Sequence, residues 1–249
     1  MKIFSLAGRN IKEVYRDPVS MLLGLAMPVA FLILFSSIYK KAQLEMFSPQ
    51  MLTPGIVVFC FAFLIMFAAI LMAKDKESAL LTRLFTTPLK PSDFILAYIL
   101  PFLPIAFFQT VICLIVGAIL GATFQNLVLT CVIFFFTAMI CISFGMILGT
   151  LFTVNQVPGA GSLLITAIGL FCGAWAPLKM MGGVFETIGY ALPFAHAVDA
   201  AKALLAGSSF ADITGNFYII LIYARYQISK FYANNYIFYN TLFLSLFLF

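Results

Sequence analysis

The sequence predicts an all-α, polytopic membrane protein with six transmembrane helices, and three observations lead to this fold class. Hydrophobic residues make up 63% of the 249-residue chain and charged residues only 9%, whereas a soluble domain carries about 25% charge. So few charges cannot cover a water-facing surface, and lipid must therefore surround most side chains. The apolar residues also gather into runs of about 20, the length at which a helix crosses the hydrocarbon core. We expect one transmembrane domain over residues 1–249 and no separate catalytic domain.

The spans follow from where polar residues interrupt these runs. No charged residue occurs between Asp93 and Lys179, and polar breaks at residues 121–126 and 153–156 divide this long stretch. The predicted spans are residues 19–39, 54–73, 94–120, 127–152, 157–178 and a sixth at 213–223, which Arg225 interrupts.

The distribution of Lys and Arg predicts the orientation. If the N-terminus is inside, the inside segments hold ten of these residues and the outside segments four. Positive residues gather on the cytoplasmic side of membrane proteins. We therefore expect a multi-pass protein of the plasma membrane with its N-terminus inside, and we interpret the net charge of +5 as topology, with no nucleic-acid partner.

The C-terminal end, residues 225–249, is atypical. It is rich in Tyr, Asn, Phe and Ile and closes on a bare apolar run. Two interpretations stay open, namely a frameshifted or otherwise altered end and a genuine interfacial segment rich in aromatic residues.

Residues 1–18 are predicted to form an amphipathic helix that lies in the membrane interface. One helical face carries Phe4, Ala7, Ile11 and Val14. The cations lie largely off that face, where they would meet anionic headgroups; they include Arg9, Lys12 and Arg16. The alternative is an ordinary charged flank of the first span.

Residues 74–93 form the one substantial inside loop and predict a short helix. Asp75 or Ser78 can cap its start, and Pro88 stops it. The apolar face of this helix comprises Leu80, Leu81, Leu84 and Phe85. A helix this short is marginal in water, so it needs a surface to pack on, either the bilayer or a groove in a partner.

These residues carry a family resemblance. Residues 74–89 resemble the cytoplasmic loop between spans two and three of the type-2 ABC exporter permeases, and the match is good over Leu-Phe-Thr-Thr-Pro-Leu at 84–89. Ser78-Ala79-Leu80 stands where that family usually has Gly-Thr-Leu, and Thr82 stands at its common Glu. Residues 177–201, an apolar helix, a Pro-Phe break and an Ala-rich helix, are similar to the segment between spans five and six. The residues before Pro18 are similar to the helix that leads into span one, and the resemblance covers residues 1–206.

The resemblance implies a coupling helix, a dimer and a separate ATPase. The coupling helix would dock on the nucleotide-binding ATPase subunit through Glu77, Leu80, Leu81, Arg83, Leu84, Phe85 and Pro88. The helix before span one would present Arg9, Lys12 and Arg16, and an outside re-entrant segment at 178–206 would include Phe185, Pro193, His196 and Asp199. The implied partners are the ATPase, a second copy or a similar permease, and membrane lipids. No cofactor binds this chain directly, because ATP and Mg²⁺ belong to the partner subunit.

Missing motifs exclude several other functions. The sequence has no G-x-x-x-x-G-K-[ST], no H-E-x-x-H and a single histidine, so we expect no enzymatic activity. Spans one to five as predicted hold no charged residue, which disfavours an ion-coupled carrier. The few polar residues in the spans suit an amphipathic or lipid-like cargo for an ATP-driven exporter. A non-transporting membrane scaffold or assembly protein is the main alternative; an intramembrane enzyme would need clustered polar groups that are not found.

Overall fold

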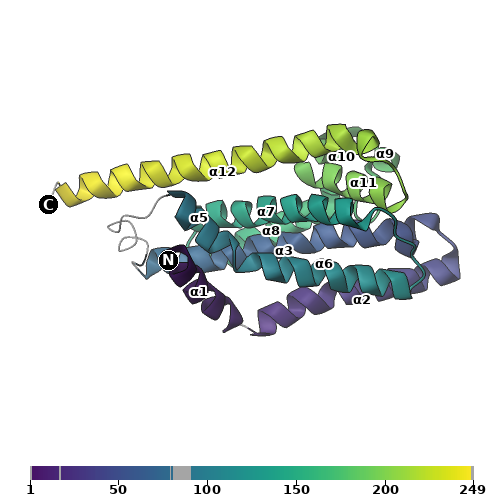
Figure 1. Cartoon of the computed structure of the whole chain (residues 1–249), viewed down its shortest axis with the longest axis horizontal. Helices are drawn as coiled ribbons and strands as arrows, with labels where there is room; N and C mark the ends of the chain where they lie inside the picture. The colour runs from purple at the N-terminus through teal and green to yellow at the C-terminus, as the bar shows by residue number, and fades with distance from the viewer. Residues whose placement is uncertain (1, 17, 79, 81–90, 248–249) are drawn as a thin grey trace.

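The computed structural model describes residues 2–16, 18–78, 80 and 91–247, and every regular element in these ranges is helical. The long helices run side by side along the long axis (Figure 1). The elements, in chain order, are α1 (Lys2–Tyr15), α2 (Pro18–Ala42), the 3-10 helix η1 (Glu45–Phe47), α3 (Pro49–Glu77), α5 (Pro91–Ile99), α6 (Phe102–Ile119), α7 (Leu127–Leu151), α8 (Val157–Phe171), α9 (Leu178–Met181), α10 (Gly183–Tyr190), α11 (Pro193–Leu205) and α12 (Phe210–Phe247).

Four stretches are long and apolar enough to cross a membrane. They are Gly24–Ala42, Pro49–Glu77, Asp93–Ile119 and Leu127–Leu151, and α8 is a shorter apolar helix. By length and composition the chain is a polytopic helical membrane protein, as predicted.

Two predicted spans differ from the helices observed. The third is two helices, α5 and α6, because Pro101 lies between them and has no N–H to continue the hydrogen-bond ladder. The fifth was predicted to reach residue 178, which is wrong: α8 ends at Phe171, and Gly173 then turns the chain with φ +71°, a conformation that glycine adopts without steric cost.

The ends of two further helices also differ from prediction. α3 was expected to stop at Ala73 but continues to Glu77, so that four charged residues, 74–77, belong to its last turn. α12 passes through Arg225 without a break. Both interpretations of residues 225–249 stay open, because a continuous helix is compatible with either.

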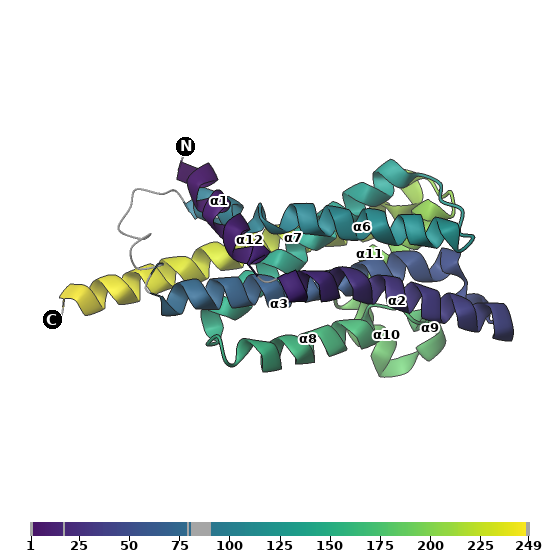
Figure 2. The same ribbon diagram turned by 90° about the horizontal axis from the view of Figure 1, so that it is seen from below.

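α3 is the centre of the bundle. The most apolar 18-residue stretch of α3 is 78% buried, whereas that of α2 is 17% buried. α6 and α8 lie on opposite sides of α3 (Figure 2). α7 lies close against α3 at Gly145 and Gly149: a Cβ atom at Gly149 would lie 2.5 Å from the Ala69 carbonyl oxygen, and one at Gly145 would collide with the Ile65 carbonyl. Small residues four positions apart let two helix backbones meet in this way.

The bundle has two ends with different compositions. α1, the last turn of α3 and the start of α5 lie at one end, called here the loop end, and η1 with α9, α10 and α11 lie at the other, called the α11 end (Figure 1). Arg9 and Glu77 lie at the loop end, and Phe185, Pro193, His196 and Asp199 lie in the elements of the α11 end.

Candidate functional site

A buried carboxylate organises the loop end. Asp75, in the last turn of α3, has no solvent exposure. Its Oδ2 atom accepts hydrogen bonds from Arg9 Nη1 and from the Tyr98 hydroxyl, each at 2.6 Å. A buried charge is tolerated when it is paired and hydrogen-bonded in this manner. One side chain of α3 is thereby tied to both α1 and α5.

α1 docks on α5 through a second polar contact. Asn10 is fully buried, and its Nδ2 donates to the Ala97 carbonyl at 3.1 Å. Arg9 Nη1 also donates to Asn10 Oδ1 at 3.0 Å. The hydrogen bond from Arg9 to Asp75 raises the pKa of the guanidinium still further above neutrality.

The predicted apolar face of α1 packs on the protein only in part. Phe4 is 75% exposed, whereas Ala7 and Asn10 are buried. Arg9 was expected to lie largely off this apolar face and to meet lipid headgroups; its guanidinium instead pairs with Asp75. Lys12 and Arg16 are exposed, and Arg16 pairs locally with Glu13 at 3.4 Å.

Two more charged residues tie the same turn of α3 to α7. Lys76 Nζ donates to the carbonyls of Thr150 and Phe152 at 3.0 and 2.8 Å. These carbonyls lie at the C-terminus of α7, where backbone acceptors lack helical partners and a cation is favourable. Glu77 Oε1 accepts from the backbone N–H of Val154 at 2.8 Å, in the connection to α8.

These contacts change the interpretation of the residues that begin the loop. Asp75 or Ser78 was predicted to cap the start of a separate loop helix, and the structure places both at the end of α3 instead. Ser78 is the C-cap of α3, with its N–H bonded to the Lys74 carbonyl at 2.9 Å, and Asp75 is buried one turn earlier.

The predicted coupling residues are only partly covered by the described ranges. Glu77 is held by Val154, and Leu80 is a partly buried residue in helical conformation. The remaining five lie outside the described residues, and their docking role stays a prediction: Leu81, Arg83, Leu84, Phe85 and Pro88.

The α11 end brings together two of the residues predicted for the re-entrant segment. Both contact Tyr190 of α10: its hydroxyl donates to Asp199 Oδ2 at 2.6 Å, and its carbonyl lies 3.0 Å from His196 Nε2. The other ring nitrogen of His196 lies 2.8 Å from Asn216 Oδ1 in α12. His196 thus joins α10, α11 and α12 as a structural residue.

The other two predicted residues lie apart from this group. Pro193 is the first residue of α11, a position where its missing N–H costs nothing. Phe185 is stacked on Phe171 with ring centroids 5.5 Å apart. Among the residues that the structure describes, no group of three His, Cys, Asp or Glu side chains could hold a metal ion.

Sequence reasoning missed Asp75, Tyr98 and Lys76 as contact residues. Asp75 and Lys76 were assigned to a loop because the apolar run ends at Ala73. A helix that continues for one turn past its apolar run would have placed Asp75 and Lys76 on two different faces, one toward α1 and one toward α7. Tyr98 carried no signal, since a tyrosine in an apolar run is ordinary.

The comparisons with known proteins identify the family. A search of curated proteins gave no match. The family model described as ABC-2 type transporter matches residues 1–206, from α1 through α11, which is most of the chain. Members of this family are permease components, generally not catalytic themselves, that typically pair with an ATP-binding subunit. Together with its apolar helices, this match shows that the chain is an integral membrane protein of the ABC-2 type transporter family and the permease of an ABC transporter.

Proposed function

We propose that the chain is the six-span permease of an exporter that moves an amphipathic or lipid-like substrate with ATP hydrolysed on a separate subunit. It acts as a dimer in the plasma membrane with its N-terminus inside. α8 and α12 provide the fifth and sixth crossings, and the segment that follows α3 docks on the ATPase. The observation that carries this proposal is the set of contacts made by the last turn of α3.

That turn is connected to four other parts of the bundle. Asp75 contacts α1 and α5, Lys76 contacts α7, and Glu77 contacts the connection between α7 and α8. A displacement of the segment after Ser78 therefore reaches all of these elements together. Interdomain rocking in transporters requires helices to move as rigid groups, and these contacts supply the rigidity at the point where the ATPase would push.

The scarcity of charged residues inside the bundle favours a transporter that is driven by an ATPase outside the membrane. Among the described residues of the four candidate spans, Asp75 is the buried charged residue, and it lies at the loop end rather than mid-span. Ion-coupled carriers hold charged residues near the bilayer midplane. The threonine hydroxyls bond to carbonyls of their own helix, as at Thr110 and Thr137, so they present little polarity to a cargo, which suits an amphiphile.

The docking role can be tested by co-purification with the ATP-binding partner subunit. Leu84→Asp should abolish co-purification, because it places a charge on the apolar face of the coupling segment. Leu151→Asp is the matched control, since Leu151 is an exposed leucine at the end of α7, and it should leave co-purification intact. Equal binding by wild type and Leu84→Asp would show that the docking site is elsewhere.

Transport itself requires both subunits. Proteoliposomes that hold the permease and the ATPase should accumulate a fluorescent amphiphile only with hydrolysable ATP. Accumulation by the permease alone would contradict ATP coupling and favour a carrier.

A further inference from the structure

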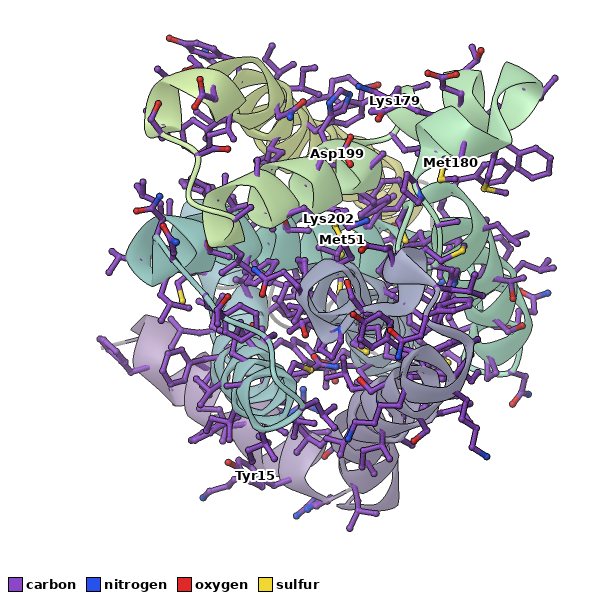
Figure 3. All side chains as sticks on the ribbon, turned by 90° about the vertical axis from the view of Figure 1, so that its right-hand side faces the viewer. Tyr15, Met51, Lys179, Met180, Asp199 and Lys202 are labelled. Atoms are coloured by element: carbon purple, nitrogen blue, oxygen red, sulfur yellow. The ribbon has the colours of Figure 1, made fainter. Side chains whose placement is uncertain are left out.

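A cavity of about 650 Å³ opens at the α11 end. Its volume lies in the range of small-molecule sites, about 300–1,000 Å³. The walls come from the segment around η1, from residues 174–177 and from α11. Met51, Met180, Asp199 and Lys202 gather at this end of the molecule (Figure 3). The apolar lining includes Leu44, Met46, Met51, Trp175, Met180 and Ala203.

One wall of the cavity is fixed and the rest is adaptable. The Trp175 ring packs against Phe31, Phe35 and Phe59 with centroid distances of 5.3, 5.1 and 5.2 Å, so three aromatic neighbours hold it in place. The three methionine side chains are unbranched and can adjust to an irregular apolar ligand.

Lys202 places a cation in these apolar surroundings. Its Nζ donates to the Gly173 carbonyl at 2.9 Å, which occupies one of three donor hydrogens. Asp199, one turn earlier on α11, is bonded to the Tyr190 hydroxyl. Within the described ranges, no carboxylate oxygen lies within the 4.0 Å ion-pair distance of Lys202 Nζ. Burial lowers the pKa of Lys202, and Asp199 offsets this only in part.

We propose that this cavity binds an amphiphile with one anionic head group, its apolar chain against Trp175 and the methionines and its head against Lys202. A partly buried cation without an ion-pair partner favours an anion, and a charge-assisted hydrogen bond to carboxylate or phosphate would use the remaining donors. Glu45 also lines the cavity but is exposed to solvent. The proposal concerns binding and stands whether or not the ligand is the exported cargo.

Trp175 makes this binding directly measurable, because it is the single tryptophan of the chain. The full-length permease in phosphatidylcholine vesicles is titrated with dibromostearic acid at about pH 8, well above the ordinary pKa of a carboxyl group, while tryptophan emission is recorded. Saturable quenching that excess oleic acid reverses is expected. Half-quenching by the methyl ester of the same probe should require an about tenfold higher concentration, since the ester cannot form a charge-assisted hydrogen bond.

Variants separate the cavity from the surrounding lipid. Lys202→Gln should weaken binding of the acid to the level of the ester. Lys202→Arg should keep the difference between the half-quenching concentrations of the two probes. Ala203→Phe fills the cavity and should abolish saturable quenching by both probes. Its matched control, Ala211→Phe, adds the same ring at an exposed residue of α12 near the same end and should change nothing.

Two sources share this ligand chemistry, and a second arm distinguishes them. Vesicles with brominated phosphatidylglycerol should quench more than vesicles with brominated phosphatidylcholine if the ligand is an anionic membrane lipid; quenching by the free acid alone identifies a single-chain acid. Equal quenching by acid and ester in unaltered protein, together with no preference for phosphatidylglycerol, overturns the proposal. Leu84→Asp, which tests ATPase docking, should leave the quenching unchanged, so the two proposals fail separately.

Discussion

The guanidinium of Arg9 and the carboxylate of Asp75 lie 2.6 Å apart, although 66 positions separate them in the sequence. The carboxylate is buried and the arginine side chain is 40% exposed. Removing Arg9 would leave the buried carboxyl group of Asp75 with the Tyr98 hydroxyl as its remaining donor among the described residues.

Arg9→Gln should lower the free energy of unfolding by about 2 kcal/mol, because a buried carboxylate loses its cation. Unfolding in mixed detergent micelles, followed by circular dichroism, measures this. Arg16→Gln removes a comparable cation from an exposed pair, that with Glu13, and should change stability by less than about 1 kcal/mol. Similar losses in the two variants would mean that the buried pair contributes no more than a surface pair.

Lys76→Met should uncouple α3 from α7 at the loop end, since it removes the donor shared by the Thr150 and Phe152 carbonyls. ATP-driven transport per ATP hydrolysed should fall about fivefold, which corresponds to about 1 kcal/mol of coupling free energy. Lys74 lies two residues earlier and is exposed, so Lys74→Met serves as the control and should transport normally. The reverse ranking of these two variants would remove Lys76 from the coupling route.

Gly149→Ala should destabilise the bundle by about 1–3 kcal/mol, the usual cost of overpacking, because the added methyl group meets the α3 backbone at Ala69. Gly159→Ala is the matched control, since nothing lies within 4 Å of its Cβ position, and higher helix propensity should make it neutral or slightly stabilising. Thermal unfolding followed by size-exclusion chromatography compares them. If Gly149→Ala were as stable as Gly159→Ala, the close approach of α3 and α7 would be wrong.

Lys202 should make a contribution to the stability of the protein that rises with pH as the pH approaches 10.5, opposite in sign to the contribution of Tyr190, whose pKa is raised by burial and by its hydrogen bond to Asp199. Burial lowers the pKa of Lys202 from 10.5 in the folded state. Between the lowered value and 10.5 the unfolded chain binds more protons, so the free energy of unfolding increases with pH. Compared with the wild type, Lys202→Met should lose this contribution, so the slope of its stability against pH should be lower, whereas Lys179→Met, at an exposed lysine of the same end, should keep the wild-type slope. Equal slopes in Lys202→Met and the wild type would show that Lys202 makes no such contribution.

The membrane class and most helix positions could be predicted because they depend on composition and on runs of apolar residues. Helix ends were less predictable. The break at Pro101 lies in an uninterrupted apolar run, and the end of α8 depends on the positive φ of Gly173, so neither changes the hydropathy on which the spans were assigned.

The contacts of the candidate site could not be predicted for a different reason. In lipid, an exposed apolar residue such as Phe4 is as acceptable as a buried one, so an apolar stripe does not identify the face of α1 that meets the protein. That face contains Asn10, whose amide is satisfied by the Ala97 carbonyl, and such a pairing exists only once α1 and α5 have docked. The partners of Asp75 and Lys76 likewise depend on how the helices rotate against one another.

The enclosure of α3 has a consequence for how the chain can vary. Hydrocarbon tails are fluid and adapt to any apolar shape, whereas a protein interior is packed like a crystal and registers the change of a single methylene group. α2, mostly uncovered within one copy, should accept exchanges among Leu, Ile, Phe and Met along much of its length, while α3 should accept few. In natural variants of this chain, divergence should therefore concentrate in α2 and leave α3 as the slowly changing axis of the fold.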